Sequence, residues 1–451
     1  MECDVLVAEI GSTTTKVNAF KEIDGRWQYL GQGQGATTVA EGDVTIGLRN
    51  ASEDLCRRLG CSEITGREFL ASSSAAGGLR MTVHGLVQDM TVKAAREAAL
   101  GAGANVSLVT SGKLRKSDIE KLKAISPNII MIAGGLDFGE RETSLHNAGM
   151  IRESGLKAPV IYAGNVENQE EIRSILDGYE GKVYIVDNVY PRIDELNVEP
   201  ARRVIQKVFE EHIMEAPGMH KVREMVKGRI MPTPGAVMEA AKLLYESLGD
   251  LLVIDVGGAT TDVHSVAEGS EEILRILMAP EPLAKRTVEG DLGVYVNRWN
   301  LADLIGLDEL EREFGNGARE LVRDLKPIPS DELELRMASR LAEKAVEISV
   351  RRHAGVTRQL YGEAGGRRMV AEGKDLTSVR HVIGTGGALS RLPGGRGILE
   401  RIQRIGKGTE LLPKNEAEVH LDTMYIMAAV GVMAVSNRKG ALELLKWSLE
   451  I

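Results

Sequence analysis

The sequence contains few cysteines, and their spacing excludes two classes of protein. The three in the chain of 451 residues are Cys3, Cys56 and Cys61. They form neither a disulfide framework nor a C-x-x-C metal site, which indicates a reduced, cytoplasmic protein. Acidic residues at positions 2, 4 and 9 interrupt the first apolar stretch, a pattern unlike a signal peptide.

The sequence also lacks a long apolar run and an excess of basic residues. Its longest apolar run, at 424–435, is well short of the roughly 20 residues that cross a bilayer. The formal net charge is −9, and the basic residues of 396–407 are spaced along a predicted helix rather than clustered. We therefore expect a soluble protein that has neither a membrane nor a nucleic acid as its main partner.

What the sequence does contain is an alternation of short β-branched runs with longer amphipathic stretches, which is typical of α/β proteins. The length favours two to four domains. Near the N-terminus we expect a strand at 3–10, its hairpin partner at 26–34, a helix at 46–60 and a further strand at 68–75. The alternating glycines of 31–36 lack the G-x-G-x-x-G spacing, so we assign them no dinucleotide role.

Residues 86–215 repeat one pattern four times. Apolar runs at 106–111, 128–135, 159–165 and 183–188 are each followed by a polar amphipathic stretch, which predicts a parallel sheet buried on both faces. Residues that follow the strands can bind a ligand or only turn the chain, and both readings stay open for Gly134, Gly135, Asp137, Gly164 and Asn165. Asp137 and His146 do not match the D-x-H-x-x-G cobalamin motif, so a corrinoid site is not expected.

Two further segments share one arrangement. "VLVAEIGSTTTK" at 5–16 and "LVIDVGGATTDVHSV" at 252–266 each run from an apolar strand through one acid and glycine into a group of hydroxyl residues. Two such turns can hold opposite sides of a polyphosphate through backbone N–H groups. An acid at each strand end can hold Mg²⁺ through water.

A third segment, "VRHVIGTGGALSRL" at 379–392, again enters a glycine-rich turn. The three segments in this order resemble the two phosphate loops and the adenosine motif of the actin, hexokinase and heat-shock-chaperone ATPase superfamily. The resemblance implies two lobes of ribonuclease-H-like topology that bind ATP and Mg²⁺ between them. It divides the chain into a first lobe at 1–85, an inserted or expanded α/β region at 86–215 and a second lobe at 216–451.

The resemblance assigns roles to individual residues. Glu9, Asp255 and Asp262 are the catalytic candidates, and Glu9 and Asp255 the metal candidates; the superfamily usually has aspartate where this chain has Glu9. The candidates for nucleotide binding are Gly11, Ser12, Thr13, Thr14 and Lys16 in the first loop, Gly257, Gly258 and Thr260 in the second, and Gly384, Gly386 and Gly387 in the adenosine motif.

Within the superfamily, the chain most resembles the MutL-like (GlmL) accessory family encoded with adenosylcobalamin-dependent aminomutases. That resemblance rests on "GSTTTK", "IGTGGALS", "ASSSAAGGLRM" at 71–81 and "RTVEGDLGV" at 286–294. The last two segments can be plain turns, or contacts in which Glu289 or Asp291 lies near the nucleotide. The resemblance implies a reactivating ATPase that exchanges damaged cobalamin in an aminomutase of the glutamate mutase or ornithine aminomutase type.

Two alternatives use the same superfamily fold. A small-molecule kinase needs a substrate pocket and a base beside the γ-phosphate, and an actin-like filament protein would use the inserted region for assembly. An activator that carries an iron–sulfur cluster is disfavoured, because neither Cys56 nor Cys61 follows a glycine-rich loop.

Overall fold

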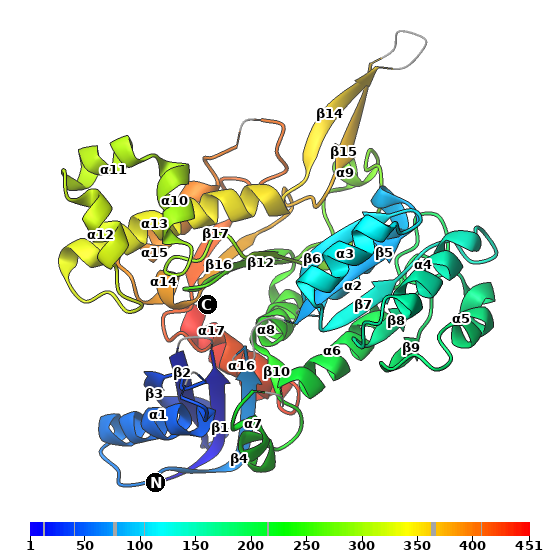
Figure 1. The fold of residues 1–451 in the computed structure, drawn as a ribbon. Coiled ribbons are helices and arrows are strands. Elements are labelled where there is room, and N and C mark those ends of the chain that lie inside the picture. Colours follow the sequence, from blue (N-terminus) through cyan, green and yellow to red (C-terminus); the bar gives the residue numbers. More distant parts are fainter. Residues whose placement is uncertain are drawn as a thin grey trace. The chain divides into compact units, whose positions relative to one another are not determined.

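The computed structural model describes residues 1–11, 14–39, 41–74, 79–102, 104–213, 216–361, 367–406 and 408–451 (Figure 1). The chain forms two compact units. The first comprises Met1–Ala75, Pro217–Met278 and Leu283–Ile451, and the second comprises Ala76–Ala216 with Ala279–Pro282. In the part of the chain that is described, no helix combines the length and the hydrophobicity that a bilayer-spanning segment needs.

The first unit contains a five-stranded mixed sheet near the N-terminus, in the order β10-β4-β1-β2-β3. Strand β2 is antiparallel to both of its neighbours, whereas β1, β4 and β10 run parallel. The predicted hairpin between β1 and β3 is wrong, because the hydroxyl-rich segment after β1 is itself strand β2 and pairs with both. The strands are β1 Glu2–Ile10, β2 Thr14–Ile23, β3 Arg26–Ala36, β4 Thr65–Ser73 and β10 Met231–Pro232.

A second mixed sheet in the same unit has the same topology. Its order is β13-β12-β11-β16-β17, with β12 antiparallel to its two neighbours and β11, β16 and β17 parallel. Both sheets thus show the 3-2-1-4-5 strand order of ribonuclease-H-like folds, which confirms the predicted two-lobed, actin-like α/β architecture. The strands are β11 Leu251–Val256, β12 Thr261–Val266, β13 Ala284–Glu289, β16 His381–Thr385 and β17 Glu418–Leu421.

Helices α8 and α16 contribute to a core that both sheets share. Val5 and Val7 of β1 and Leu251 and Val253 of β11 belong to one buried cluster with these helices, and burial of such side chains is the main stabilising term in folding. The opposite face of the second sheet packs on α13. The bounds are α8 Thr233–Leu248, α16 Met427–Met433 and α13 Glu332–His353.

Helix α1, Val44–Leu59, lies against the glycines of β3. Asp43 caps its first turn by accepting a hydrogen bond from the Thr45 N–H at 2.9 Å. A Cβ on Gly33 would collide with the backbone of α1 at Ala51. The alternating glycines therefore permit a close helix–strand approach, which is a structural reason for a pattern that carries no dinucleotide role.

The other elements of the first unit complete these layers. They are α7 Met219–Met225, α9 Glu271–Leu274, α10 Arg298–Ile305, α11 Leu307–Phe314, α12 Ala318–Asp324, α14 Gly387–Ser390, α15 Gly395–Ile402 and α17 Arg438–Leu449, with a separate hairpin of β14 Val356–Tyr361 and β15 Arg367–Glu372.

The second unit is a doubly wound α/β structure whose five strands are all parallel, in the order β6-β5-β7-β8-β9. The four predicted apolar runs form β6 to β9, and β5 adds a fifth strand that lies entirely before residue 86. The strands are β5 Arg80–Gly85, β6 Asn105–Ser111, β7 Ile129–Ile132, β8 Val160–Tyr162 and β9 Val183–Ile185. The helices are α2 Lys93–Gly101, α3 Lys116–Ile125, α4 Glu142–Glu153, α5 Gln169–Ile175 and α6 Glu199–Ile213, with a π-turn at Gln88–Val92 and a 3-10 turn at Val166–Asn168.

Candidate functional site

The first glycine-rich turn joins β1 to β2. The Gly11 N–H donates to the Thr14 carbonyl at 3.0 Å, and the Gly11 carbonyl accepts from the Thr37 hydroxyl of the neighbouring segment at 2.9 Å. A Cβ on Gly11 would meet the Thr14 carbonyl oxygen at 2.7 Å, so a side chain there would force the turn open. Ser12 and Thr13 lie outside the described residues.

The acid and the lysine of this turn face each other across the hairpin. Glu9 and Lys16 are paired in the β1–β2 register, and the Lys16 Nζ lies 2.8 Å from Glu9 Oε2. Asn18 donates to the other oxygen, Glu9 Oε1, at 2.8 Å. Both the Glu9 and the Lys16 side chains are buried. Burial alone would lower the pKa of Lys16, but the Glu9 carboxylate, together with Tyr425 and Asp255, outweighs burial and raises this pKa.

Lys16 also contacts Tyr425, which follows β17 of the second sheet. Its Nζ lies 3.3 Å from the ring centroid of Tyr425, a cation–π contact in a largely desolvated position. The same Tyr425 ring lies beside Gly387, and the preceding residue Gly386 packs on Asp255. The lysine of the first turn is thus joined through Tyr425 to the third segment, which packs on the acid of the second turn.

A chain of amide side chains extends this contact. Gln32 Nε2 donates to Asn18 Oδ1 at 2.8 Å and to the Tyr425 carbonyl at 3.2 Å. Arg391 donates to Gln32 Oε1 at 3.1 Å. Because Arg391 lies at the end of the third segment and Asn18 holds Glu9, these hydrogen bonds connect the first and third motifs through Gln32 and Asn18.

The second glycine-rich turn repeats the backbone geometry of the first. The Gly257 N–H donates to the Thr260 carbonyl at 2.9 Å, as Gly11 does to Thr14. The Gly258 carbonyl accepts from the backbone N–H groups of Tyr295 and Val296, at 2.9 and 2.8 Å. The turn is therefore held from one side by the segment that follows β13.

The acids of the second turn are paired in register, as Glu9 and Lys16 are in the first. Asp262 is fully engaged: Arg286 donates to its Oδ1 from Nε at 2.9 Å, and Thr260 donates to its Oδ2 at 3.0 Å. For Asp255, burial and then the charge of Asp262 raise the pKa to about 7. An acid with so high a pKa at the end of a strand, beside a glycine-rich turn, is typical of a functional site.

The third segment packs directly on the second turn. Gly386 has a φ of 88°, and a Cβ there would collide with Asp255 Oδ1 and with the Val256 backbone. Gly384 is surrounded by leucine side chains, and a Cβ on it would lie 2.6 Å from the nearest of them. Around Gly387 the nearest atoms are those of the Tyr425 ring, 3.9 Å from where a Cβ would lie, which leaves its backbone open on that side.

Two residues near this segment carry signals that the sequence interpretation missed. Asp422 accepts from the Thr385 hydroxyl at 2.8 Å and from the Ile426 and Met427 N–H groups, so it fixes the third segment to the start of α16. Tyr425 adopts a positive φ of 56°, which is uncommon for a residue other than glycine. An aspartate directly after the short strand β17, whose residues alternate between polar and apolar, was the available clue.

The segment 286–294 supports the second turn rather than contacting it with its acids. Glu289 and Asp291 both accept from Arg352 Nη1, at 2.6 and 2.9 Å. Gly293 packs on Ala259, where a Cβ would collide with the backbone. Of the segment 71–81, residues 75–78 lie outside the described residues, and Ser72 and Ser73 are buried in β4.

In the second unit, the candidate residues after the strands bind one another. Asp137 Oδ1 accepts from the Val166 N–H and from Asn188 Nδ2, at 3.0 and 2.9 Å. Asn165 caps the next turn by accepting from the Glu167 N–H at 3.0 Å. Gly134 and Gly135 have positive φ values of 151° and 72°, and Gly164 packs on the Gly134 backbone. The polar groups there join loop to loop, which favours the turn reading.

The three motifs of the first unit thus converge, although they are far apart in sequence. A carboxylate pair, Glu9 and Asp255, shares one site with the Lys16 ammonium and with three glycine-rich turns. Oxygen donors of this kind suit Mg²⁺, and a lysine beside backbone N–H groups suits phosphate. The residues therefore fit a magnesium–nucleotide complex in their chemistry.

Comparisons with known proteins agree on the family. The model of the family described as MutL protein matches residues 5–449. "Protein MutL" from Clostridium tetanomorphum is 37% identical over 464 residues, which cover 98% of both chains. Among solved structures, nucleotide-free acetone carboxylase matches at a TM-score of 0.41 and 14% identity, over 96% of this chain and 70% of that one. Component A of Acidaminococcus fermentans (R)-2-hydroxyglutaryl-CoA dehydratase matches at 0.31 and 11%, over 97% and 98%. Similarity at that level carries no functional argument, whereas the sequence matches span nearly the whole chain. The chain belongs to the MutL protein family.

Proposed function

We propose that this protein is a Mg²⁺-dependent ATPase that remodels an adenosylcobalamin-dependent aminomutase. The observation that carries the ATPase part is the duplicated hairpin: Glu9 and Asp255 occupy equivalent positions in two sheets of the same topology. Lys16 pairs with Glu9 and contacts Tyr425 beside the third glycine-rich turn. Two such turns with acids and one cation between them suit a polyphosphate with its metal.

In this proposal, Glu9 and Asp255 hold Mg²⁺ through water, and the metal offsets phosphate charge and polarises the bond that breaks. Lys16 exchanges its contact with Glu9 for one with phosphate. The backbone of Gly258 and the hydroxyls of Ser12, Thr13 and Thr14 contact phosphate oxygens. Gly11 and Gly257 close the two turns, and Thr260 is held by Asp262. Gly386 and Gly387 lie against the nucleoside, while Gly384 lets leucine side chains pack on β16 behind them.

Asp262 has a positioning role in this proposal, because both of its oxygens are already engaged. It holds the Thr260 hydroxyl at 3.0 Å and is itself neutralised by Arg286. The site contains acids but no activated nucleophile among its described residues, so hydrolysis proceeds by attack of water and not through a covalent intermediate.

Binding and turnover of ATP by matched variants test this proposal. We expect Glu9→Gln and Asp255→Asn to lose about a hundredfold in turnover, since each removes a charge aimed at the metal, while nucleotide binding weakens less. Asp303→Asn, an exposed acid of α10, is the control for loss of one negative charge. Wild-type turnover by either site variant would contradict the metal role assigned to that residue.

The kinase alternative is tested with the same preparation. Turnover of ATP is compared with and without candidate metabolites, and a kinase would consume ATP only with its acceptor and would yield a phosphorylated product. A filament protein would instead scatter light on addition of Mg·ATP. The proposed ATPase hydrolyses ATP without an acceptor and does not polymerise.

The partner is the finer part of the proposal, and it rests on the family to which the chain belongs. An aminomutase whose cobalamin has been damaged would be opened by cycles of ATP binding and hydrolysis, and the nucleotide would supply the difference in affinity between two conformations. We place this activity in the cytoplasm, where three free cysteines remain reduced.

The second unit is the proposed contact surface for this partner, because nucleotide binding does not require it. Apolar side chains are exposed on the loops that follow β7, β8 and β9: Phe138 by 78%, Val166 by 40% and Ile193 by 67%. Hydrogen bonds join these loops, since the Asp137 N–H donates to the Pro191 carbonyl and Asp137 accepts from Val166. Exposed apolar side chains gathered in this way are typical of protein-binding surfaces.

A further inference from the structure

Two histidines and a glutamate meet at the edge of the second sheet, outside the site described above. His381 begins β16, and Glu418 and His420 lie on the edge strand β17. The parallel register pairs His381 with Glu418 and Ile383 with His420. Since alternate residues of a strand share a face, all three side chains project from the same face of the sheet.

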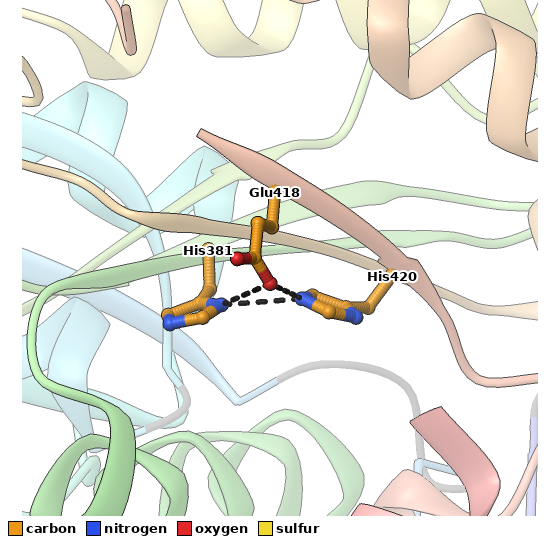
Figure 2. Close-up of side chains that lie close together, drawn as sticks. All are labelled: His381, Glu418 and His420. Carbon is orange, nitrogen blue, oxygen red and sulfur yellow. Dashed lines mark hydrogen bonds and ion pairs between the residues drawn. The ribbon is translucent and has the colours of Figure 1, made fainter. Parts of the chain in front are cut away.

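Their polar atoms converge on one point, as Figure 2 shows. His381 Nδ1 and His420 Nε2 are 3.1 Å apart, and Glu418 Oε2 lies 3.9 Å from the first and 3.6 Å from the second. Ligand atoms around a tetrahedral zinc ion are about 3.3–3.6 Å from one another, because each bond is about 2.0–2.2 Å long. The spacing is therefore close to that of three ligands around one metal ion.

The surroundings suit a metal ligand as well. The histidine side chains are only 13% and 11% exposed, which restricts their orientations, whereas Glu418 is 69% exposed and leaves the site open to solvent.

We propose that His381, Glu418 and His420 bind one divalent transition-metal ion of the zinc type. Two imidazoles and one carboxylate favour zinc or a similar ion over Mg²⁺ and Ca²⁺, which prefer all-oxygen sites. Three protein ligands leave a fourth position for water. The ion would join the strand that leads into Gly384 and Gly386 to the edge strand β17.

Titration of the chelator-treated full chain with Zn²⁺ by calorimetry tests the proposal. We expect one ion per chain, with an affinity reduced at least about tenfold in Glu418→Gln and more in His381→Ala, since loss of an outer-shell contact alone costs about 10–100-fold. His220→Ala, an exposed histidine of α7, should bind as the wild type does. With Co²⁺ in place of Zn²⁺, the absorption spectrum should show the visible bands of a four-coordinate ion. It should show no thiolate charge-transfer band, because no cysteine is a proposed ligand.

The contrary results are equally defined. If the wild type binds no Zn²⁺ at one per chain, or if His381→Ala and Glu418→Gln both bind it with wild-type affinity, the proposal is wrong and the two imidazoles only share a proton. A thiolate band with Co²⁺ would transfer the site to the cysteines and would likewise overturn it. Glu418→Gln keeps the test valid if a histidine variant fails to fold, because Glu418 is largely exposed.

Discussion

Replacing Asp255 with asparagine should make the ligand-free protein more stable at pH 8 and leave it nearly unchanged at pH 4. Burial and the charge of Asp262 raise the pKa of Asp255 from 3.8 to about 7. Between pH 3.8 and about 7, the folded state therefore keeps a proton that the unfolded chain has lost. Over this range the free energy of unfolding falls as pH rises. Asparagine has the same shape and no charge to bury.

The size of the effect follows from the shift. A rise from 3.8 to about 7 is about three units, and each unit corresponds to 1.36 kcal/mol, so ionised Asp255 destabilises the fold by about 4 kcal/mol at most. Partial access of solvent to the side chain reduces this figure. The difference in stability between Asp255→Asn and the wild type should grow from pH 4 to pH 7 and stay constant above it.

Urea unfolding followed by tryptophan fluorescence measures this difference. All tryptophans of the chain, at positions 27, 299 and 447, lie in the first unit, so the signal reports that unit alone. Asp303→Asn is the control for net charge. A stability difference that does not change with pH, or a variant less stable than the wild type at pH 8, would refute the raised pKa of Asp255.

Three other perturbations have defined outcomes. Arg286→Met should cost about 3–5 kcal/mol because it leaves the buried Asp262 carboxylate unpaired, and adding Asp262→Leu should recover most of the loss in urea unfolding; no recovery would show that the ion pair is not the cause. Gly386→Ala should weaken ATP binding and destabilise the first unit by more than about 1 kcal/mol, because a side chain at positive φ would press on Asp255; wild-type binding in an equilibrium titration would contradict this packing. Phe138→Ser with Ile193→Ser should spare ATP hydrolysis and abolish rescue of the aminomutase; unchanged rescue would exclude this surface as the contact.

The sequence was sufficient for features that depend on neighbouring residues. The apolar run before Asp255, the glycines after it and their repetition from the first turn are local patterns, and the predicted strands and parallel sheet follow from them. The hairpin partner of the first strand was predicted wrongly at 26–34, because another strand lies between the two. The β-branched threonines after Gly11 suit a strand, and that segment is β2.

The sequence was insufficient for contacts between distant residues. Gln32 is separated from Arg391 by 359 positions and from Tyr425 by 393, so no spacing rule could pair them. The sequence also offered no reason to pair Arg286 with Asp262. The two meet only because β13 pairs with β12. The cluster around His381 was missed for the same reason, since only the pairing of β16 with β17 brings its residues together.

The most direct test of the proposed function is recovery of an inactivated aminomutase. A glutamate mutase or ornithine aminomutase is inactivated with hydroxycobalamin and then incubated with this protein, Mg·ATP and fresh adenosylcobalamin, while mutase activity is followed. We expect recovery that requires ATP hydrolysis and is lost with Asp255→Asn. Recovery that is equal without ATP or with Asp255→Asn, or no recovery with either enzyme, would contradict the proposed function.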